Sequence, residues 1–465
     1  MTATETETAN FIDYATLKTI ANKPEPSFGR VRQLMEKARE LKGLSMEESA
    51  ELINLSDPES LSLLLETAGY VKDAIYGKRM VLFAPVYTGN VCSNNCTYCG
   101  FRRDNKELNR INLNREQITA EVEALLKQGH KRILILCGEH ASHPLQKTVE
   151  AIRTAYAADY RGHSIRRINV ELAPMSVEDF RELKKEKIGT YTCFQETYDP
   201  DLYKLYHKDG PKADYLNRLT VMDRAMEAGI DDVGVGVLFG LADYRSEVLA
   251  LFAHARHLEE RFGCGPHTVS VPRIEPAPGA PLTENVPFPV SDEDFKKIVA
   301  LIRVSMPYTG IILSTRESEA IRKELFHYGV SQVSAGSKTD PGGYSSHHDE
   351  NAQFTLGDHR SLEEVVSNLV DDGYIPSFCT GCYRMGRVGN DFMDLAKPGL
   401  IKRFCQPNGM SSFAEYLYDF AGEETRRKGL ALLKDMARGI DDPVTRERAE
   451  KGLEEVSCGN RDIYV

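Results

Sequence analysis

Three cysteines lie within the short segment CSNNCTYCGF, at Cys92, Cys96 and Cys99. Thiolates at such close spacing are typical ligands of zinc or of an iron–sulfur cluster. A structural zinc ion would be expected to have a fourth ligand nearby, but the next cysteine along the chain is Cys137. A 4Fe-4S cluster held by three cysteines instead leaves one iron open to an outside ligand. The triplet therefore favours an open iron–sulfur cluster over zinc.

A second group of three cysteines follows much later in the chain: Cys379, Cys382 and Cys405. The spacing alone leaves two hypotheses open, a second cluster with an open iron or a zinc site completed by Cys458 or by a histidine. The other four cysteines are isolated in the sequence. We interpret them as small buried hydrophobes: Cys137, Cys193, Cys264 and Cys458.

Eight short apolar runs rich in β-branched residues alternate with amphipathic segments. Asn114 and Gln117 form a capping-box pattern before one of these segments, and Gly129 ends it. The pattern predicts an α/β fold, a parallel (β/α)8 barrel, with a doubly wound open sheet as the alternative. The predicted strands are MVLFAPVY, RILILC, RRINVEL, TYTCFQ, DDVGVGVLF, HTVSVPRIEP, GIILST and SQVSAG. In a barrel, the first triplet and other residues directly after strands would meet at the catalytic mouth.

The chain divides into three predicted parts. Residues 1–80 are expected to form an N-terminal helical cover, residues 81–340 the barrel, and residues 341–465 a mainly helical C-terminal domain that carries the second triplet. A Gly-, Ser- and His-rich loop opens this last part. The group at residues 345–350 resembles a metal patch, but we interpret it as a solvated loop.

Composition indicates a small-molecule enzyme. The formal charge of -11 and the pI near 5.7 give no basic field for nucleic acid or anionic lipid. The first residues, MTATETETANFIDYATL, have no secretory signal pattern, and no apolar run approaches the ~18 residues that a membrane span needs. We therefore expect a cytoplasmic protein with thiolate-bound metal in a reducing compartment and without nucleic-acid or membrane partners.

The pattern C-x-x-x-C-x-x-C, with the aromatic Tyr98 before its last cysteine, resembles the signature of the radical S-adenosylmethionine (SAM) superfamily. The resemblance implies that SAM chelates the open iron and that the reduced cluster breaks a C–S bond of SAM. The resulting 5'-deoxyadenosyl radical would abstract a hydrogen atom from the substrate. A low-potential electron donor is then required as a partner.

The same resemblance implies SAM contacts after the next three strands. The tripeptide Gly138-Glu139-His140 resembles the family's GGE-type motif, which binds the SAM amino group, although His140 departs from it. Carboxylates after the third and fourth strands could bind the ribose or methionyl part, or could simply cap the following helices. The predicted SAM contacts are Tyr98, Gly138, Glu139, His140, Glu171, Gln195 and Glu196.

Both triplets together resemble the tyrosine lyases that mature FeFe-hydrogenase, the HydG family. The resemblance implies cleavage of the Cα–Cβ bond of L-tyrosine to p-cresol and dehydroglycine. Dehydroglycine would then yield CO and cyanide on iron for H-cluster assembly, in cooperation with other hydrogenase maturation proteins. The resemblance also implies an auxiliary 4Fe-4S cluster at the opposite end of the barrel. His267, at the start of the sixth strand, would hold its additional labile iron, although a histidine in this position is usually structural.

The substrate carboxylate requires a fixed cation. Arg316, after the seventh strand, is suited to a bidentate contact, with Ser334 after the eighth strand as a helper. Arg273, beyond the sixth strand, is a competing candidate. Dehydroglycine would have to travel through the barrel to the second cluster, because release into water would hydrolyse it.

Two other functions stay open at this point. The thiamine-pathway 2-iminoacetate synthase shares the barrel chemistry but stops at dehydroglycine and lacks the C-terminal triplet. An electron-transfer or scaffold protein with two clusters is the alternative outside the enzymes.

Overall fold

The computed structural model describes residues 10–346 and 351–465. Eight parallel strands form a closed barrel, because each strand pairs with the next, β8 pairs with β1, and β1 pairs with β2. The prediction of a (β/α)8 barrel rather than an open sheet is confirmed, as are all eight predicted strands. Their bounds are β1 Arg79–Gly89, β2 Arg132–Cys137, β3 Arg167–Glu171, β4 Tyr191–Thr192, β5 Val233–Gly236, β6 Thr268–Ser270, β7 Gly310–Leu313 and β8 Gln332–Ser334.

Helices connect successive strands on the outside of the barrel. The predicted capping box is present at the first of them, where Asn114 and Gln117 each accept the other's backbone N–H, and Gly129 ends the helix in the left-handed conformation. The connecting helices are α6 Arg115–Gln128, α7 Leu145–Ala157, α8 Val177–Lys185, α9 Pro200–Tyr206, η1 Pro211–Ala213, α10 Tyr215–Leu219, α11 Val221–Glu227, α12 Tyr244–Phe262, η2 Pro281–Glu284, α13 Asp292–Ser305 and α14 Glu319–Tyr328.

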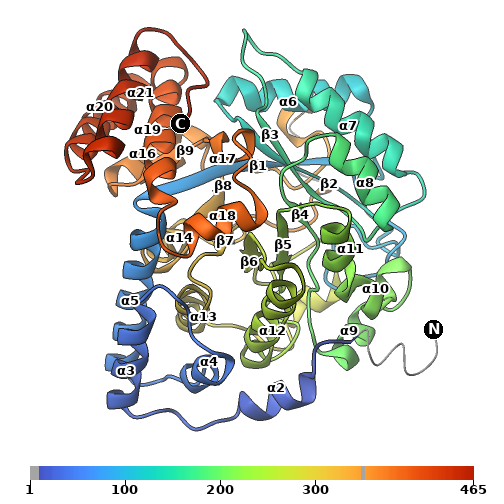
Figure 1. Cartoon of the computed structure of the whole chain (residues 1–465). Helices are drawn as coiled ribbons and strands as arrows, with labels where there is room; N and C mark the ends of the chain where they lie inside the picture. Colours follow the sequence, from blue (N-terminus) through green and yellow to red (C-terminus); the bar gives the residue numbers. More distant parts are fainter. Residues whose placement is uncertain (1–9, 347–350) are drawn as a thin grey trace.

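Four helices precede the barrel: α2 Tyr14–Ile20, α3 Phe28–Ala38, α4 Met46–Leu52 and α5 Pro58–Tyr76. They lie along one side and the lower edge of the molecule in Figure 1. Helix α5 packs on α13 and α14, whereas α2 and α4 pack on α12. The apolar faces of these helices join the barrel's main hydrophobic core.

The C-terminal part is mainly helical, as expected, and stands beside β1 at one corner of the barrel (Figure 1). It contains α15 Gly343–Ser346, α16 Leu362–Asp371, β9 Ile375–Ser377, α17 Gly381–Arg384, α18 Gly389–Ala396, α19 Lys402–Asp419, α20 Glu423–Arg438 and α21 Pro443–Ser457. Strand β9 was not expected. It pairs in parallel with Arg79, Met80 and Val81 of β1, on the edge that β2 leaves free.

The structure covers only part of the loop predicted at residues 345–350. In the predicted solvated loop, Ser345 and Ser346 are exposed, and residues 347–350 lie outside the described part. The division of the chain at residues 80 and 340 stays a prediction. In the described ranges, no helix is both long enough and apolar enough to cross a lipid bilayer.

Candidate active site

A cavity of about 220 Å3 opens at the C-terminal ends of the strands. All eight strands or the segments directly after them contribute lining residues, and this is the end where barrel enzymes bind substrates. Cys92, Cys96 and Cys99 line it together. We call it the mouth cavity.

Burial favours the neutral form of two cysteines of the first triplet, Cys96 and Cys99. It raises the pKa of Cys96 to about 12 and also raises the pKa of Cys99. A cationic metal centre would compensate the cost of ionising these thiols. The side-chain amide of Gln353 lies 3.6 Å from Cys99 Sγ as a hydrogen-bond donor. Three sulfurs on one loop, facing one cavity, fit an open 4Fe-4S cluster.

Three predicted SAM contacts adjoin the cysteine loop and line the mouth cavity: Tyr98, Gly138 and Glu139. The Glu139 carboxylate accepts a hydrogen bond from the Asn94 amide at 2.7 Å. Gly138 is packed tightly, because a Cβ at this position would lie 2.4 Å from the Val91 carbonyl oxygen.

The structure does not bring His140 and Gln195 into the mouth cavity. His140 Nδ1 instead accepts the backbone N–H of Ser142 at 3.0 Å and stabilises a local turn. Gln195 is buried, and neither polar atom of its side chain has a hydrogen-bond partner among the described residues. Neither residue is part of the cavity lining. The two SAM contacts therefore stay predictions that the cavity lining does not support.

Glu171 and Glu196 both line the mouth cavity, but their surroundings shift the two carboxyl pKa values in opposite directions. Burial and the neighbouring Glu196 carboxylate raise the pKa of Glu171 to about 7. Burial alone would also raise the pKa of Glu196, but Lys212, with its Nζ 2.6 Å from the carboxylate, and Arg218 lower it below its usual value. The site thus holds one permanent carboxylate and one that gains a proton near neutral pH.

Arg316 is the better placed of the two candidate substrate arginines. Its guanidinium lines the mouth cavity, stacks on Phe354 at 3.3 Å from the ring centroid, and donates no hydrogen bond within the described residues. Ser334 also lines the cavity, and its Oγ accepts the Thr315 N–H at 3.1 Å.

Arg273, the competing candidate, is already engaged by neighbouring residues. Its guanidinium is paired with Glu317 and with Asp292, and donates to the Val290 carbonyl at 2.9 Å. It is absent from the cavity lining. Arg273 therefore stays a competing prediction that the structure supports less than Arg316, because its donors are already engaged.

The polar lining residues that were not predicted from the sequence include Lys212, Arg218 and Gln353. They come from η1, from α10 and from the segment after residue 350. No motif marks them. The acidic Glu196 offers one indirect signal, because a buried carboxylate requires cationic partners.

A second pocket lies at the N-terminal ends of the strands. Cys379, Cys382, Cys405 and His267 line it, together with Arg79, Val81, Arg132, Gly310 and Gln332 from strand starts. His267 Nε2 lies 3.0 Å from the Tyr383 hydroxyl, and its Nδ1 has no hydrogen-bond partner among the described atoms. We call this the floor pocket.

Two cysteines of the floor pocket, Cys382 and Cys405, shift each other's pKa in opposite directions. A hydrogen bond from Cys405, assisted by Arg387, lowers the pKa of Cys382 below its usual value, and the same bond raises the pKa of Cys405. Three sulfurs beside a half-buried imidazole fit an iron–sulfur cluster with an additional iron.

The isolated cysteines differ from one another. Cys193 and Cys264 are buried, as predicted, whereas Cys137 is half-buried and lines the mouth cavity. Cys458 is exposed at the end of α21, so the interpretation as a buried residue is wrong. It is not part of the floor-pocket lining, which weakens the zinc alternative.

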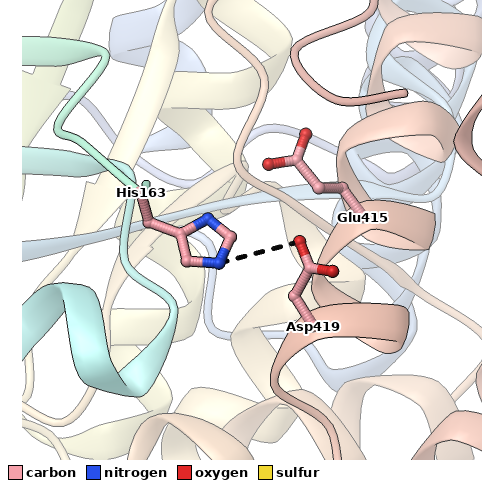
Figure 2. A group of neighbouring side chains, drawn as sticks. All are labelled: His163, Glu415 and Asp419. Carbon is pink, nitrogen blue, oxygen red and sulfur yellow. Dashed lines mark ion pairs between the residues drawn. The ribbon is translucent and has the colours of Figure 1, made fainter. Parts of the chain in front are cut away.

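His163, Glu415 and Asp419 form another group with metal-ligand side chains (Figure 2). The carboxylates are already paired, because Arg166 donates two hydrogen bonds to Glu415 and Arg461 donates two to Asp419. The group is therefore an ion-pair contact between the segment before β3 and α19.

Comparisons with known proteins agree with this geometry. The family model of the Radical SAM superfamily matches residues 86–254, and that of the Biotin and Thiamin Synthesis associated domain matches residues 270–375. The 2-iminoacetate synthase of Salmonella typhimurium is 30% identical over 353 residues, covering 75% of this chain and 90% of the relative.

Two solved structures match almost the whole chain. A crystal structure of HydG, described as a maturase of FeFe-hydrogenase, is 46% identical, with a TM-score of 0.94 and coverage of 98% of this chain and 100% of the other. The FeFe-hydrogenase maturase HydG from Carboxydothermus hydrogenoformans is 44% identical, with a TM-score of 0.80 and coverage of 95% and 96%. The chain therefore belongs to the radical SAM superfamily and, within it, to the family of FeFe-hydrogenase maturases represented by HydG.

Proposed function

We propose that this protein is a radical SAM tyrosine lyase that cleaves the Cα–Cβ bond of L-tyrosine and makes CO and cyanide for FeFe-hydrogenase assembly. The single observation that carries the proposal is the placement of two cysteine triplets at opposite ends of one barrel. One end would generate the fragment, and the other would convert it.

Cys92, Cys96 and Cys99 would hold a 4Fe-4S cluster, which together with SAM and an electron from a low-potential donor supplies a hydrogen-abstracting radical. The chain's own residues hold the reactants in position. Glu139 and the Gly138 backbone would bind the methionyl part of SAM, and Glu196 would bind its ribose. Arg316 would hold the tyrosine carboxylate in a bidentate contact, and the Ser334 hydroxyl would support it.

The proposed reaction begins with loss of a hydrogen atom from the tyrosine amino group. The Cα–Cβ bond then breaks, and the phenolic fragment takes up an electron and a proton to become p-cresol. The other product is dehydroglycine, HN=CH–COOH. Its conversion to HCN, CO and water balances without further redox change, so the floor pocket needs to supply only binding and proton transfer.

Cys379, Cys382 and Cys405 would hold the auxiliary 4Fe-4S cluster, and His267 would bind the additional iron. The position of His267 supports this role, because its half-buried imidazole lines the floor pocket and its Nδ1, 3.5 Å from the Asp232 carboxylate, makes no hydrogen bond within the described residues. Other hydrogenase maturation proteins would receive the product.

The alternative function is that of a 2-iminoacetate synthase, which would stop at dehydroglycine. The 30% identity to the Salmonella typhimurium enzyme favours it. The floor triplet argues against it, because that reaction needs no second cluster.

The test is anaerobic reconstitution with iron and sulfide, followed by turnover with tyrosine, SAM and dithionite. We expect 5'-deoxyadenosine, p-cresol, cyanide and CO, the last trapped by deoxyhaemoglobin. Cys96→Ala should abolish all four products, whereas Cys405→Ala should keep p-cresol and lose CO. Cys458→Ala, at the exposed cysteine outside both pockets, is the matched control and should retain all products.

Each failure points to a different function. Formation of p-cresol without CO by the parent protein would favour the 2-iminoacetate synthase. Absence of 5'-deoxyadenosine with a fully reduced mouth cluster would favour an electron-transfer or scaffold protein.

A further inference from the structure

Glu247, on α12, is a buried carboxylate remote from both cysteine triplets in sequence. It is 1% exposed and accepts three hydrogen bonds. The donors are the Tyr14 hydroxyl at 2.8 Å, the Thr197 hydroxyl at 3.0 Å and the Tyr198 backbone N–H at 2.9 Å. Two of the three donors thus belong to the residues that directly follow Glu196.

Glu196 has an unusual backbone conformation. Its φ is +70°, in the left-handed region that non-glycine residues seldom adopt and that costs free energy unless neighbouring contacts enforce it. On one side, the Leu238 N–H bonds to the Glu196 carbonyl at 2.9 Å. On the other side, Glu247 fixes Thr197 and Tyr198. These contacts direct the Glu196 carboxylate into the mouth cavity, where it meets Lys212.

The N-terminal segment reaches this network through Tyr14. Phe11 stacks on His257 of α12, with ring centroids 3.6 Å apart and planes 3° from parallel. The Tyr198 hydroxyl bonds to His254 Nδ1 at 2.8 Å. One face of α12 therefore binds both the N-terminal segment and the loop after β4.

We propose that Glu247, oriented by Tyr14, is a positioning residue for Glu196 and that the N-terminal segment is thereby part of the SAM-binding machinery. The inference rests on the proposed function in one respect, the role of Glu196 as a SAM contact. Glu247 itself does not line the mouth cavity. It acts through the backbone of the two residues that follow Glu196.

The chemistry of the position supports a role beyond packing. A carboxylate costs more to bury than an apolar side chain of similar size, and burial raises the pKa of Glu247 to about 7. The Glu247 carboxylate oxygens nevertheless accept hydrogen bonds from one backbone N–H and two hydroxyls, all of them buried. An aliphatic side chain would leave these donors unsatisfied and the loop after β4 free to relax.

The experiment compares Tyr14→Phe and Glu247→Gln with the parent, each as the reconstituted full chain. Binding of labelled SAM is measured by equilibrium dialysis without reductant, and hydrogen exchange is followed in the peptide that spans residues 194–203. Tyr244→Phe is the matched control, because its hydroxyl also bonds to a carboxylate, Asp294, at 2.8 Å but lies on α12 away from the loop after β4.

We expect Tyr14→Phe to weaken SAM binding roughly fivefold, as for one lost buried hydrogen bond, and to speed exchange at Tyr198. Glu247→Gln should weaken SAM binding and speed exchange in the same direction, because its amide nitrogen cannot accept a hydrogen bond and only one of the two oxygens that serve Tyr14, Thr197 and Tyr198 remains. Tyr244→Phe should change neither readout.

Unchanged SAM affinity and unchanged exchange in Tyr14→Phe would overturn the proposal and leave Glu247 a purely structural residue. An equal loss of SAM affinity in Tyr244→Phe would overturn it as well. Because binding is measured without turnover, a parent protein that binds SAM but does not cleave tyrosine would refute the proposed reaction and leave this result unaffected.

Discussion

Val81 and Phe83 are two residues apart on β1, yet Val81 lines the floor pocket and Phe83 lines the mouth cavity. On β2, β7 and β8 as well, a residue that lines the floor pocket is followed two positions later by one that lines the mouth cavity. The pairs are Arg132 and Leu134, Gly310 and Ile312, and Gln332 and Ser334. Two residues of a strand span only about 7 Å. The two pockets are therefore divided by a single layer of inward-facing side chains.

This layer leads to a prediction about fragment transfer. Val81→Phe adds an aromatic ring at the layer, so we expect p-cresol formation to continue while the yield of CO per p-cresol falls severalfold. Val333→Phe, the same change at an inaccessible β8 residue outside both linings, is the control. It should lower the melting temperature without changing the product ratio. Equal CO to p-cresol ratios in Val81→Phe and the parent would show that the fragment takes another route.

Arg316 should govern the affinity for tyrosine. Arg316→Lys keeps the charge but loses the bidentate geometry, so the KM for tyrosine should rise about tenfold or more while the KM for SAM stays constant. In Arg273→Lys, the loss of contacts to Glu317 and Asp292 should lower the melting temperature and leave both KM values unchanged. Both KM values are measured from steady-state p-cresol formation. A higher KM for tyrosine in Arg273→Lys but not in Arg316→Lys would exchange the roles of the two arginines.

Gln353 should tune the mouth cluster through its amide, which donates to Cys99 Sγ. A hydrogen bond to a cluster sulfur stabilises the more negative, reduced state. Gln353→Leu should therefore shift the midpoint potential to a more negative value in an EPR-monitored titration. Gln332→Leu removes an amide from the floor pocket instead and should leave the potential of the mouth cluster unchanged. A potential that is unchanged or higher in Gln353→Leu contradicts the assignment.

Glu247 should also make stability depend on pH. Its folded-state pKa of about 7 lies above the ordinary 4.5, because the side chain is buried. Between these values the unfolded chain releases a proton that the folded protein keeps, so stability falls as pH rises through this window and levels off above it. The contribution is about 3 kcal/mol at most.

Melting temperatures of the metal-free protein, recorded at about pH 5 and about pH 8, test this effect. The drop between the two should be smaller in Glu247→Gln than in the parent, since glutamine does not ionise. The other titratable groups are the same in both proteins. Parallel pH profiles would mean that Glu247 does not retain its proton on folding.

The fold was predictable because its signals are local. Apolar runs such as RILILC and the capping box at Asn114 identify strands and helices within a few residues. Strand β9 gave no such signal, because it has only three residues, one of them Pro376, and is defined by pairing with β1. Its existence depends on tertiary contacts.

The site was predictable where a single segment carries the chemistry. The spacing of Cys92, Cys96 and Cys99 is enough to place three thiols on one loop. The sequence does not predict which of the adjacent residues Gln195 and Glu196 faces the cavity, because neighbouring residues point in different directions. Lys212 and Gln353 reach the mouth cavity from distant segments, so only the folded chain reveals them.

The pairing of β9 with β1 has a mechanical consequence. Val81 bonds in register with Gln332 of β8 on one side and with Ser377 of β9 on the other. The loop that starts at Cys92 follows one end of β1, and the loop that starts at Cys379 follows β9 at the other end. One continuous strand thus fixes the separation of the two cysteine-bearing loops, and a hinge between the barrel and the C-terminal helices could open only by breaking this ladder.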